Sequence, residues 1–237
     1  MLLQILTYTH HLTTMLFGIF LSAFFLGVKQ NKKNVCILLG VGAVSGLFFL
    51  ICNTVFGSLF TEAVYPIFVH LPLFLLLVFY YRFRWLPSII SIMTAYLCCQ
   101  FSNWAGIFAL SLSGLEWVYY LVRIIVTVAV FAFLSRYLCQ TTALLFAKSD
   151  RELYILGAMP FVYYVFDYST TKFSMLLYSG NKVVVEFLAF AMCISYVIFL
   201  FVYFQEYELK NSAEQYGQLT NMQLNSLHSE IEQVRSS

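Results

Sequence analysis

Charged residues are scarce in this 237-residue chain, since Asp, Glu, Lys and Arg together make up 10% of it, whereas a soluble domain carries about 25%. The chain also contains only four prolines and eleven glycines, which excludes collagen-like and disordered classes. Its 13 Lys and Arg nearly balance 11 Asp and Glu, and no basic cluster is interleaved with aromatic residues. Nucleic acid is therefore not expected as a partner.

Motifs for catalysis and metal binding are also missing from the sequence. The six cysteines form no Cys-x-x-Cys pair and lie within or beside apolar runs, so we expect small buried side chains and neither a disulfide framework nor a metal site. The glycines Gly42 and Gly46 lie inside an apolar run and predict a GxxxG helix-packing face. HExxH, GxSxG and a nucleotide-binding loop are absent. We expect no cofactor and no enzymatic activity of this chain as it stands.

Apolar residues, in contrast, make up 61% of the chain, aromatic residues 19%, and the mean hydropathy is +0.82. One soluble core cannot bury this much apolar surface, and the composition indicates an integral membrane protein. A helix needs about 20 mostly apolar residues to cross the hydrocarbon layer. The sequence predicts an all-α, polytopic transmembrane bundle of about seven spans, at residues 6–28, 35–56, 63–81, 85–110, 117–138, 153–173 and 183–204. The first span lacks a basic n-region and a small-residue cleavage site, so we expect it to be retained.

Lys and Arg are distributed unevenly among the short connections between these spans. They gather in the first, third and fifth connections, at Lys29, Lys32, Lys33, Arg82, Arg84, Arg136, Lys148 and Arg151. Basic loops stay in the cytoplasm, so we expect a cell-membrane protein with its N-terminus outside and its C-terminus inside. Opposite locations of the two termini require an odd number of spans, which favours seven.

The composition changes abruptly after residue 204, and residues 205–237 are polar. We therefore divide the chain into a transmembrane sensor domain at 1–204 and a cytoplasmic signalling and dimerisation helix at 205–237. Leu224, Leu227, Ile231 and Val234 repeat at spacings of three, four and three, the a/d pattern of a coiled coil. This pattern predicts a parallel homodimer. A single amphipathic helix lying on the membrane surface is the alternative.

The run from Leu219 to Ser237, together with closely linked spans that lack an extracellular domain, resembles the membrane half of sensor histidine kinases of the peptide-pheromone receptor type. The ATP-binding domain of these kinases belongs to the GHKL superfamily. Ile231, Glu232 and Arg235 match the I-E-x-x-R segment that precedes the phosphoacceptor box in that family. The resemblance implies that the box would begin just beyond Ser237, and that this chain is a truncation or a relative without its output module. His228 is an alternative phosphoacceptor, although no acidic residue follows it directly.

Ionisable residues within spans are functional candidates, because burying a charge in the bilayer is costly. The candidates fall in the outer halves of spans five to seven or close by, where they could form a polar mouth for a small peptide or small-molecule ligand. They are Asp167, Arg123, Glu186, Glu116, Lys172 and Lys182. In the alternative interpretation Glu116 neutralises Arg123, and Asp167 neutralises Lys172. A thiol-protease pair of Cys52 and His70 would lack an orienting acid.

These features favour a receptor and signal-relay module of a two-component system, in which helix repacking moves the last span and its tail. The second hypothesis is a small transporter or a transporter subunit. Transporters often contain internal repeats, and no such repeat is visible in this sequence. The expected partners are the lipid bilayer, a second copy of the chain and the ligand.

Overall fold

The computed structural model describes residues 2–57, 60–61, 64–147, 150–168 and 182–236, and over these residues it contains helices and no strand. The predicted all-α class is therefore confirmed. The chain divides into two compact units, Met1–Tyr196 and Val197–Ser237.

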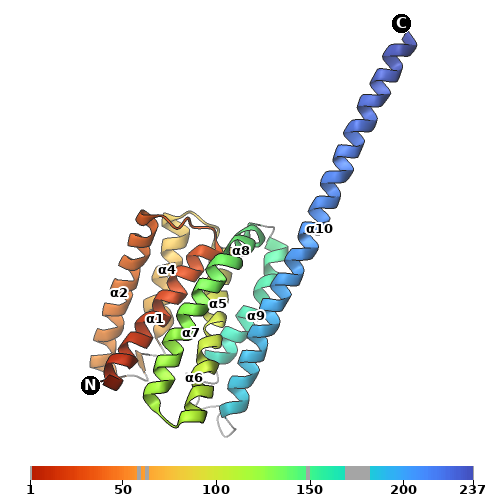
Figure 1. Cartoon of the computed structure of the whole chain (residues 1–237). Coiled ribbons are helices and arrows are strands. Elements are labelled where there is room, and N and C mark those ends of the chain that lie inside the picture. Colours follow the sequence, from red (N-terminus) through yellow and green to blue (C-terminus); the bar gives the residue numbers. More distant parts are fainter. Residues whose placement is uncertain (1, 58–59, 62–63, 148–149, 169–181, 237) are drawn as a thin grey trace. The chain divides into compact units, whose positions relative to one another are not determined.

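The first unit is a helical bundle (Figure 1). α1 packs against α2, α5, α7 and α8, while α5 packs against α9 and α6 packs against α7. Each predicted span falls on one helix or on consecutive helical pieces, except that residue 63 of the third span and residues 169–173 of the sixth lie outside the described residues. The helices are α1 (Leu2–Phe25), α2 (Lys32–Phe56), η1 (Pro66–His70), α4 (Leu71–Leu75), η2 (Leu76–Tyr80), α5 (Trp85–Cys98), α6 (Gln100–Ser113), α7 (Glu116–Tyr137), α8 (Cys139–Phe146), α9 (Asp150–Asp167) and α10 (Lys182–Ser236).

The connections alternate between the two ends of the bundle (Figure 1). The segments that follow α1, η2 and α7 lie at one end, which we call the basic end because it carries Lys29, Arg82 and Arg136, all exposed. The segments that follow α2 and α6 lie at the opposite end. At this second end Gly114 adopts a left-handed conformation (φ 66°) and donates its N–H to the Leu110 carbonyl at 2.8 Å. Glycine adopts such a φ without strain, so α7 can begin only two residues after α6 ends.

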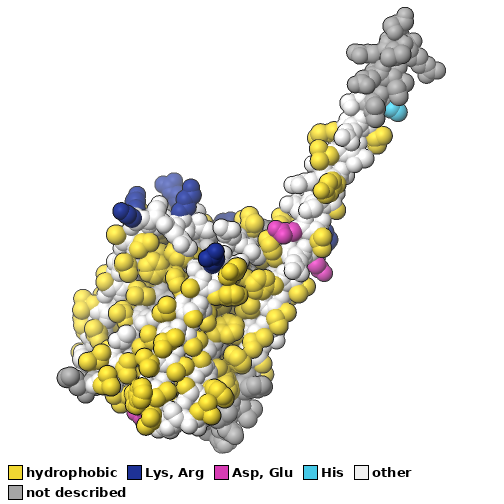
Figure 2. All heavy atoms as spheres, in the orientation of Figure 1, with side chains coloured by type: hydrophobic (Ala, Val, Ile, Leu, Met, Phe, Trp, Pro, Cys, Tyr) yellow, Lys and Arg dark blue, Asp and Glu magenta, His cyan; other side chains and the backbone are white. Residues whose placement is uncertain are grey.

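The face of the bundle seen in Figure 2 is largely apolar. In α2, Val44, Leu47 and Phe48 are 54%, 60% and 52% exposed, and water would solvate such a helix poorly. Four helices of the described chain are long and apolar enough to cross a membrane: Lys32–Phe56, Trp85–Ser113, Glu116–Tyr137 and Leu188–Ser226. The structure therefore agrees with a membrane protein. The count of seven spans stays a prediction, as does the orientation.

α1 and α9 are not among these four helices. α1 carries His10 and His11, and α9 includes Asp150, Glu152 and Asp167. In α1, hydroxyls bond to carbonyls four residues back, as Thr9 does to Ile5 at 2.8 Å. Such bonds satisfy polar side chains without water, which lets a helix of this composition pack inside a bundle.

The third predicted span is not a regular α-helix. Around α4, the η1 and η2 segments form wider π-helical turns, in which Leu71 bonds to the carbonyl of Pro66 and Tyr81 to that of Leu76. Pro72 has no N–H and its ring would clash with the carbonyl four residues back, so a wider turn relieves the conflict. This segment contributes one wall of the cavity described below.

Two further features of the structure differ from the sequence-based expectations. The fifth connection contains helix α8, whose Cys139, Leu145 and Phe146 are buried; α8 packs against α1. The prediction that all six cysteines are buried is wrong for Cys36, which is exposed near the start of α2. Cys36 faces away from the bundle, because α2 touches its neighbours along one narrow face, with Leu38, Gly42, Ser45 and Cys52 buried.

The predicted GxxxG packing face is confirmed. A Cβ atom on Gly42 would lie 2.8 Å from Leu16 Cδ2, and one on Gly46 would lie 3.3 Å from Met15 Cε. Both contacts are with α1, so the two glycines let α1 and α2 approach closely.

The second unit is the continuation of α10, which stays helical through Gly217. In this part Leu209, Tyr216 and Leu224 are 71%, 72% and 55% exposed. His228 is exposed as well. Of the predicted dimer seam, the side chains of Leu227, Ile231 and Val234 lie outside the described ones, and the coiled coil stays a prediction.

Candidate ligand-binding cavity

A cavity of about 1170 Å³ lies inside the first unit. α1, α2, the η1–α4 segment, α5, α6, α7 and the end of α9 all contribute to its wall. The polar side chains of this wall are Tyr8, His10, His11, Thr14, Ser22, Tyr65, His70, Tyr96, Cys99, Gln100, Asn103, Tyr119, Arg123, Asp167 and Tyr168. Arg123 follows the start of α7 by seven residues, which is about 10 Å along a helix. The charged groups of the cavity therefore lie in the half of the bundle away from the basic end.

Arg123 is the positively charged group of the wall. Its Nη1 donates to the Tyr119 hydroxyl at 2.5 Å, and the guanidinium carbon lies 5.1 Å from the centre of the Tyr119 ring. A Cβ atom on Gly106 would collide with the Cγ and Cδ atoms of Arg123. The absence of that atom on α6 creates the space that the arginine stem occupies.

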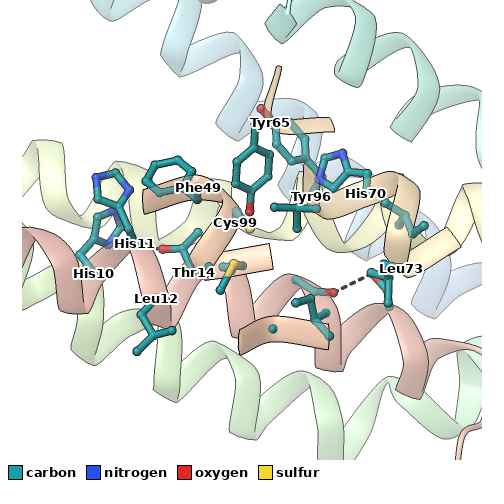
Figure 3. A pocket seen from close by; sticks show the side chains of 18 of the residues that line it. His10, His11, Leu12, Thr14, Phe49, Tyr65, His70, Leu73, Tyr96 and Cys99 are labelled. Atoms are coloured by element: carbon teal, nitrogen blue, oxygen red, sulfur yellow. Dashed lines mark hydrogen bonds between the residues drawn. The ribbon is translucent and has the colours of Figure 1, made fainter. Parts of the chain in front are cut away.

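Histidines lie on both sides of the cavity, as Figure 3 shows. His10 is 4% exposed, packs 5.8 Å from the Tyr120 ring, and shares a 3.3 Å contact with the Thr14 hydroxyl through Nδ1. On the other side, Nδ1 of His70 lies 2.9 Å from the Tyr164 hydroxyl. His70 therefore has a tyrosine partner, whereas Cys52 is absent from the wall of the cavity. This arrangement gives no support to a thiol-protease pair.

Tyrosines surround Asp167, which ends α9. Tyr96 donates its hydroxyl to Asp167 Oδ2 at 2.5 Å, and the Tyr96 ring packs 5.1 Å from Tyr164 and 6.1 Å from Tyr168. Hydrogen bonds to a carboxylate stabilise its charge in a partly desolvated position. The sequence places the ring and the carboxylate on different helices, and the contact between α5 and α9 joins them.

Gln100 is the first residue of α6, two residues after the end of α5. Its Nε2 donates to the Tyr163 hydroxyl, and its Oε1 accepts from Asn103 Nδ2 at 3.4 Å. Gln100 is only 8% exposed, so this polar contact is largely shielded from water. The amides of Gln100 and Asn103 add neutral polar groups to a wall that also carries Arg123 and Asp167.

The structure brings two of the six predicted site residues together, since both Arg123 and Asp167 line the cavity. Glu116 is exposed at the first residue of α7 and does not pair with Arg123, whose Nη1 donates to Tyr119. Lys172 lies outside the described residues. Lys182 and Glu186 lie in the first turns of α10, where the side chains are outside the described ones.

The sequence-based prediction missed the tyrosines and amides of the cavity. Tyr96, Gln100 and Tyr119 were not singled out, because a tyrosine in an apolar helix is typical of packing or of a membrane interface. One signal was available: Tyr163, Tyr164, Asp167 and Tyr168 follow one another within two helical turns. A carboxylate among tyrosines at helical spacing indicates a hydrogen-bonded acid.

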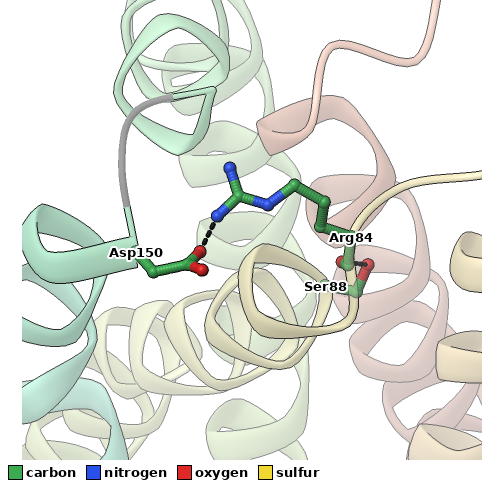
Figure 4. A network of polar contacts seen from close by, with 3 residues as sticks. All are labelled: Arg84, Ser88 and Asp150. Atoms are coloured by element: carbon green, nitrogen blue, oxygen red, sulfur yellow. Dashed lines mark hydrogen bonds and ion pairs between the residues drawn. The ribbon is translucent and has the colours of Figure 1, made fainter.

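The basic end holds a different kind of polar contact. Arg84, which precedes α5, forms an ion pair with Asp150 at the start of α9, and the Ser88 hydroxyl donates to the Arg84 carbonyl at 2.8 Å (Figure 4). The two charged side chains are 48% and 63% exposed. Exposed pairs of this kind contribute little to stability, so this contact is not a second buried site.

The chain matches no protein-family model, and neither a curated protein nor a solved structure shows significant similarity to it.

Proposed function

We propose that this chain is a membrane receptor and signal-relay module, in which a ligand bound in the cavity changes the packing of the bundle and thereby the state of the α10 tail. The observation that supports the proposal most strongly is a 1170 Å³ cavity whose wall carries Arg123, Asp167 and several tyrosines. Polar groups are costly inside an apolar bundle, and a cavity lined by them is a typical ligand site.

The path from the cavity to the tail runs through α5 and α6. Thr94 of α5 lies 3.5 Å from the Tyr196 hydroxyl of α10, and Trp104 of α6 packs 5.5 Å from the Phe190 ring. Tyr96 and Gln100, on the same stretch, line the cavity. A shift of α5 or α6 on ligand binding would therefore reach α10, which is continuous from Lys182 to Ser236.

The resemblance to sensor histidine kinases suggests the output. In this proposal α10 pairs with a second copy through Leu224, Leu227, Ile231 and Val234, and a change in that pairing is what a downstream kinase core would read. Parallel helices about a common axis place both bundles in the same membrane.

Coupling between cavity and tail tests the proposal. Asp167→Asn removes a negative charge from the cavity wall, and we expect it to change the disulfide crosslinking yield of a Leu227→Cys tail by at least twofold. Asp150→Asn, at the exposed start of the same helix, is the matched control and should leave the yield unchanged. Residues 197–237 contain no native cysteine, and the exposed Cys36 is replaced by Ser in all three proteins, so the crosslink reports on the tail. Equal yields in all three proteins would argue against a relay.

Two further controls separate the alternatives. Leu227→Cys should crosslink much better than Glu230→Cys, because only the first lies on the predicted seam; equal yields would indicate a surface helix. If Asp167 neutralises Lys172, Asp167→Asn should lower expression and Lys172→Gln should restore it.

A transporter is the second candidate, and the π-helical η1 and η2 segments favour it, since broken helices often line transport sites. Deleting residues 205–237 distinguishes the two functions. A transporter would keep its activity without the tail, whereas a receptor would lose its output.

A further inference from the structure

The guanidinium of Arg123 uses only part of its hydrogen-bonding capacity. Its Nη1 donates to Tyr119, but its Nε atom is buried and has no hydrogen-bond partner among the described residues. A guanidinium presents five N–H donors in a planar fork, and a buried donor without an acceptor costs free energy. Arg123 lines the cavity, so a ligand there could accept a hydrogen bond from the Nη donors that Tyr119 leaves unused.

Neighbouring groups hold this arginine in place. Its stem fills the space above Gly106, and its guanidinium lies over the Tyr119 ring at 5.1 Å. A charged group fixed by packing before the ligand arrives loses little entropy on binding. Arg123 is thus held in a position where it can make a specific contact with a ligand, and it does not simply extend into solvent.

The protein does not supply an anion to Arg123 among the described residues. No ion pair joins Arg123 to Asp167, although both are described and both line the cavity, and Glu116 is exposed at the start of the helix. The neutral amides of Gln100 and Asn103 share the wall with Arg123. A cavity wall that carries an arginine and neutral amides suits a carboxylate or phosphate group, because the guanidinium binds such oxyanions with charge-assisted hydrogen bonds.

The apolar part of the cavity wall indicates what kind of group the ligand carries besides its anion. Ile19 of α1, Leu47 and Leu50 of α2, and Leu73 of α4 give the cavity long apolar surfaces. We infer that the cavity binds an amphipathic anion, with its oxyanion on Arg123 and its apolar body against α1, α2 and α4. This inference rests on the proposed function and names the ligand class of the same cavity. A soluble carboxylate ligand and an anionic lipid headgroup share this chemistry.

Binding of decanoate, with decanol as the neutral analogue, tests the inference. The full chain in phosphatidylcholine nanodiscs should bind decanoate, and Arg123→Gln should weaken that binding by about tenfold or more, because a charged hydrogen bond is lost. Decanol binding should not change, since decanol carries no anion. Arg136→Gln is the matched control, because Arg136 lies on the same helix at the basic end and is absent from the cavity wall. Equal decanoate affinity in the wild-type protein and Arg123→Gln would overturn the inference.

A second variant keeps the charge and moves it. Gly106→Ala introduces a Cβ atom into the space of the Arg123 stem, while alanine itself favours a helix. We expect severalfold weaker decanoate binding and unchanged decanol binding. If Arg123→Gln does not fold, Gly106→Ala still tests whether Arg123 binds the anion. Unchanged decanoate binding in Gly106→Ala would then contradict the inference.

The source of the anion is resolved by replacing part of the phosphatidylcholine with phosphatidylglycerol. If phosphatidylglycerol competes with decanoate in the wild-type protein but not in Arg123→Gln, the natural anion is a lipid headgroup. If phosphatidylglycerol does not compete, the natural anion is a soluble ligand. Either result supports an anion site. Because these measurements read binding alone, loss of the anion site would leave the crosslinking test of the relay intact. Failure of the relay would likewise leave the binding result standing.

Discussion

The two ends of the bundle use charged residues in opposite ways. At the basic end Lys29, Lys32 and Arg82 are exposed, and the Arg84–Asp150 pair lies largely in solvent. In the opposite half Arg123 and Asp167 are half-buried, and each is hydrogen-bonded to a tyrosine. A hydrated charge needs no specific partner. Because loops rich in Lys and Arg stay in the cytoplasm, such charges indicate the orientation of the protein in the membrane. A desolvated charge must be held by specific partners, and it therefore indicates a site.

The largest expected difference between the two ends is their accessibility from outside the cell. With Cys36 replaced by Ser, a membrane-impermeant maleimide applied to intact cells should label Glu116→Cys and leave Lys32→Cys unlabelled. Both positions are exposed, so only the side of the membrane separates them. Labelling of residue 32 from outside would reverse the predicted orientation, and labelling after cell lysis serves as the control for reactivity.

The hydrogen bond from Tyr96 to Asp167 should have the next largest effect. Tyr96→Phe removes the donor and leaves a partly buried carboxylate less well satisfied, so we expect the free energy of unfolding in mixed micelles to fall by about 1.5–3 kcal/mol. Tyr137→Phe at the basic end is the matched control, because Tyr137 is 56% exposed. A surface change of this kind should stay within about 0.5 kcal/mol. Equal losses would mean that the Tyr96 hydroxyl contributes no specific contact.

The ion pair at the basic end should have the smallest effect. A double-mutant cycle with Arg84→Gln and Asp150→Asn should give a coupling energy between about 0 and 1 kcal/mol, which shrinks in high salt. Coupling that exceeds the Tyr96 effect would contradict the contrast between the two ends, because it would make the exposed pair the stronger contact.

Much of the fold could be predicted from hydropathy. The helical segments begin within a few residues of the predicted spans, because a length of about 20 apolar residues is a direct consequence of bilayer thickness. Gly42 and Gly46 were recognised as a packing face because a GxxxG spacing places two small residues on one side of a helix. Helix α8 was missed, since a short apolar segment between basic residues has the composition of a loop.

The site was predictable only in its charges. Arg123 and Asp167 stand out in apolar helices, because a charged residue within such a helix is rare and usually belongs to a functional site. Their partners did not stand out: Tyr119 and Tyr96 are ordinary aromatic residues until the packing of α5 against α9 and of α7 against α6 places them. The π-helical turns around Pro66 and Pro72 were likewise hidden, because a sequence marks a proline but not the turn that accommodates it.

From the sequence it follows that the chain is helical and apolar, where its long helices begin, and which of its loops carry the positive charge. These properties follow from the local balance of apolar and charged residues, which each segment expresses without its neighbours. The packing of the helices, in contrast, is what makes room for Arg123 at Gly106, brings Tyr96 to Asp167, and places both charges on one cavity wall. The physical reason is that a cavity depends on which faces of separate helices meet, and many arrangements of the same apolar helices bury similar area.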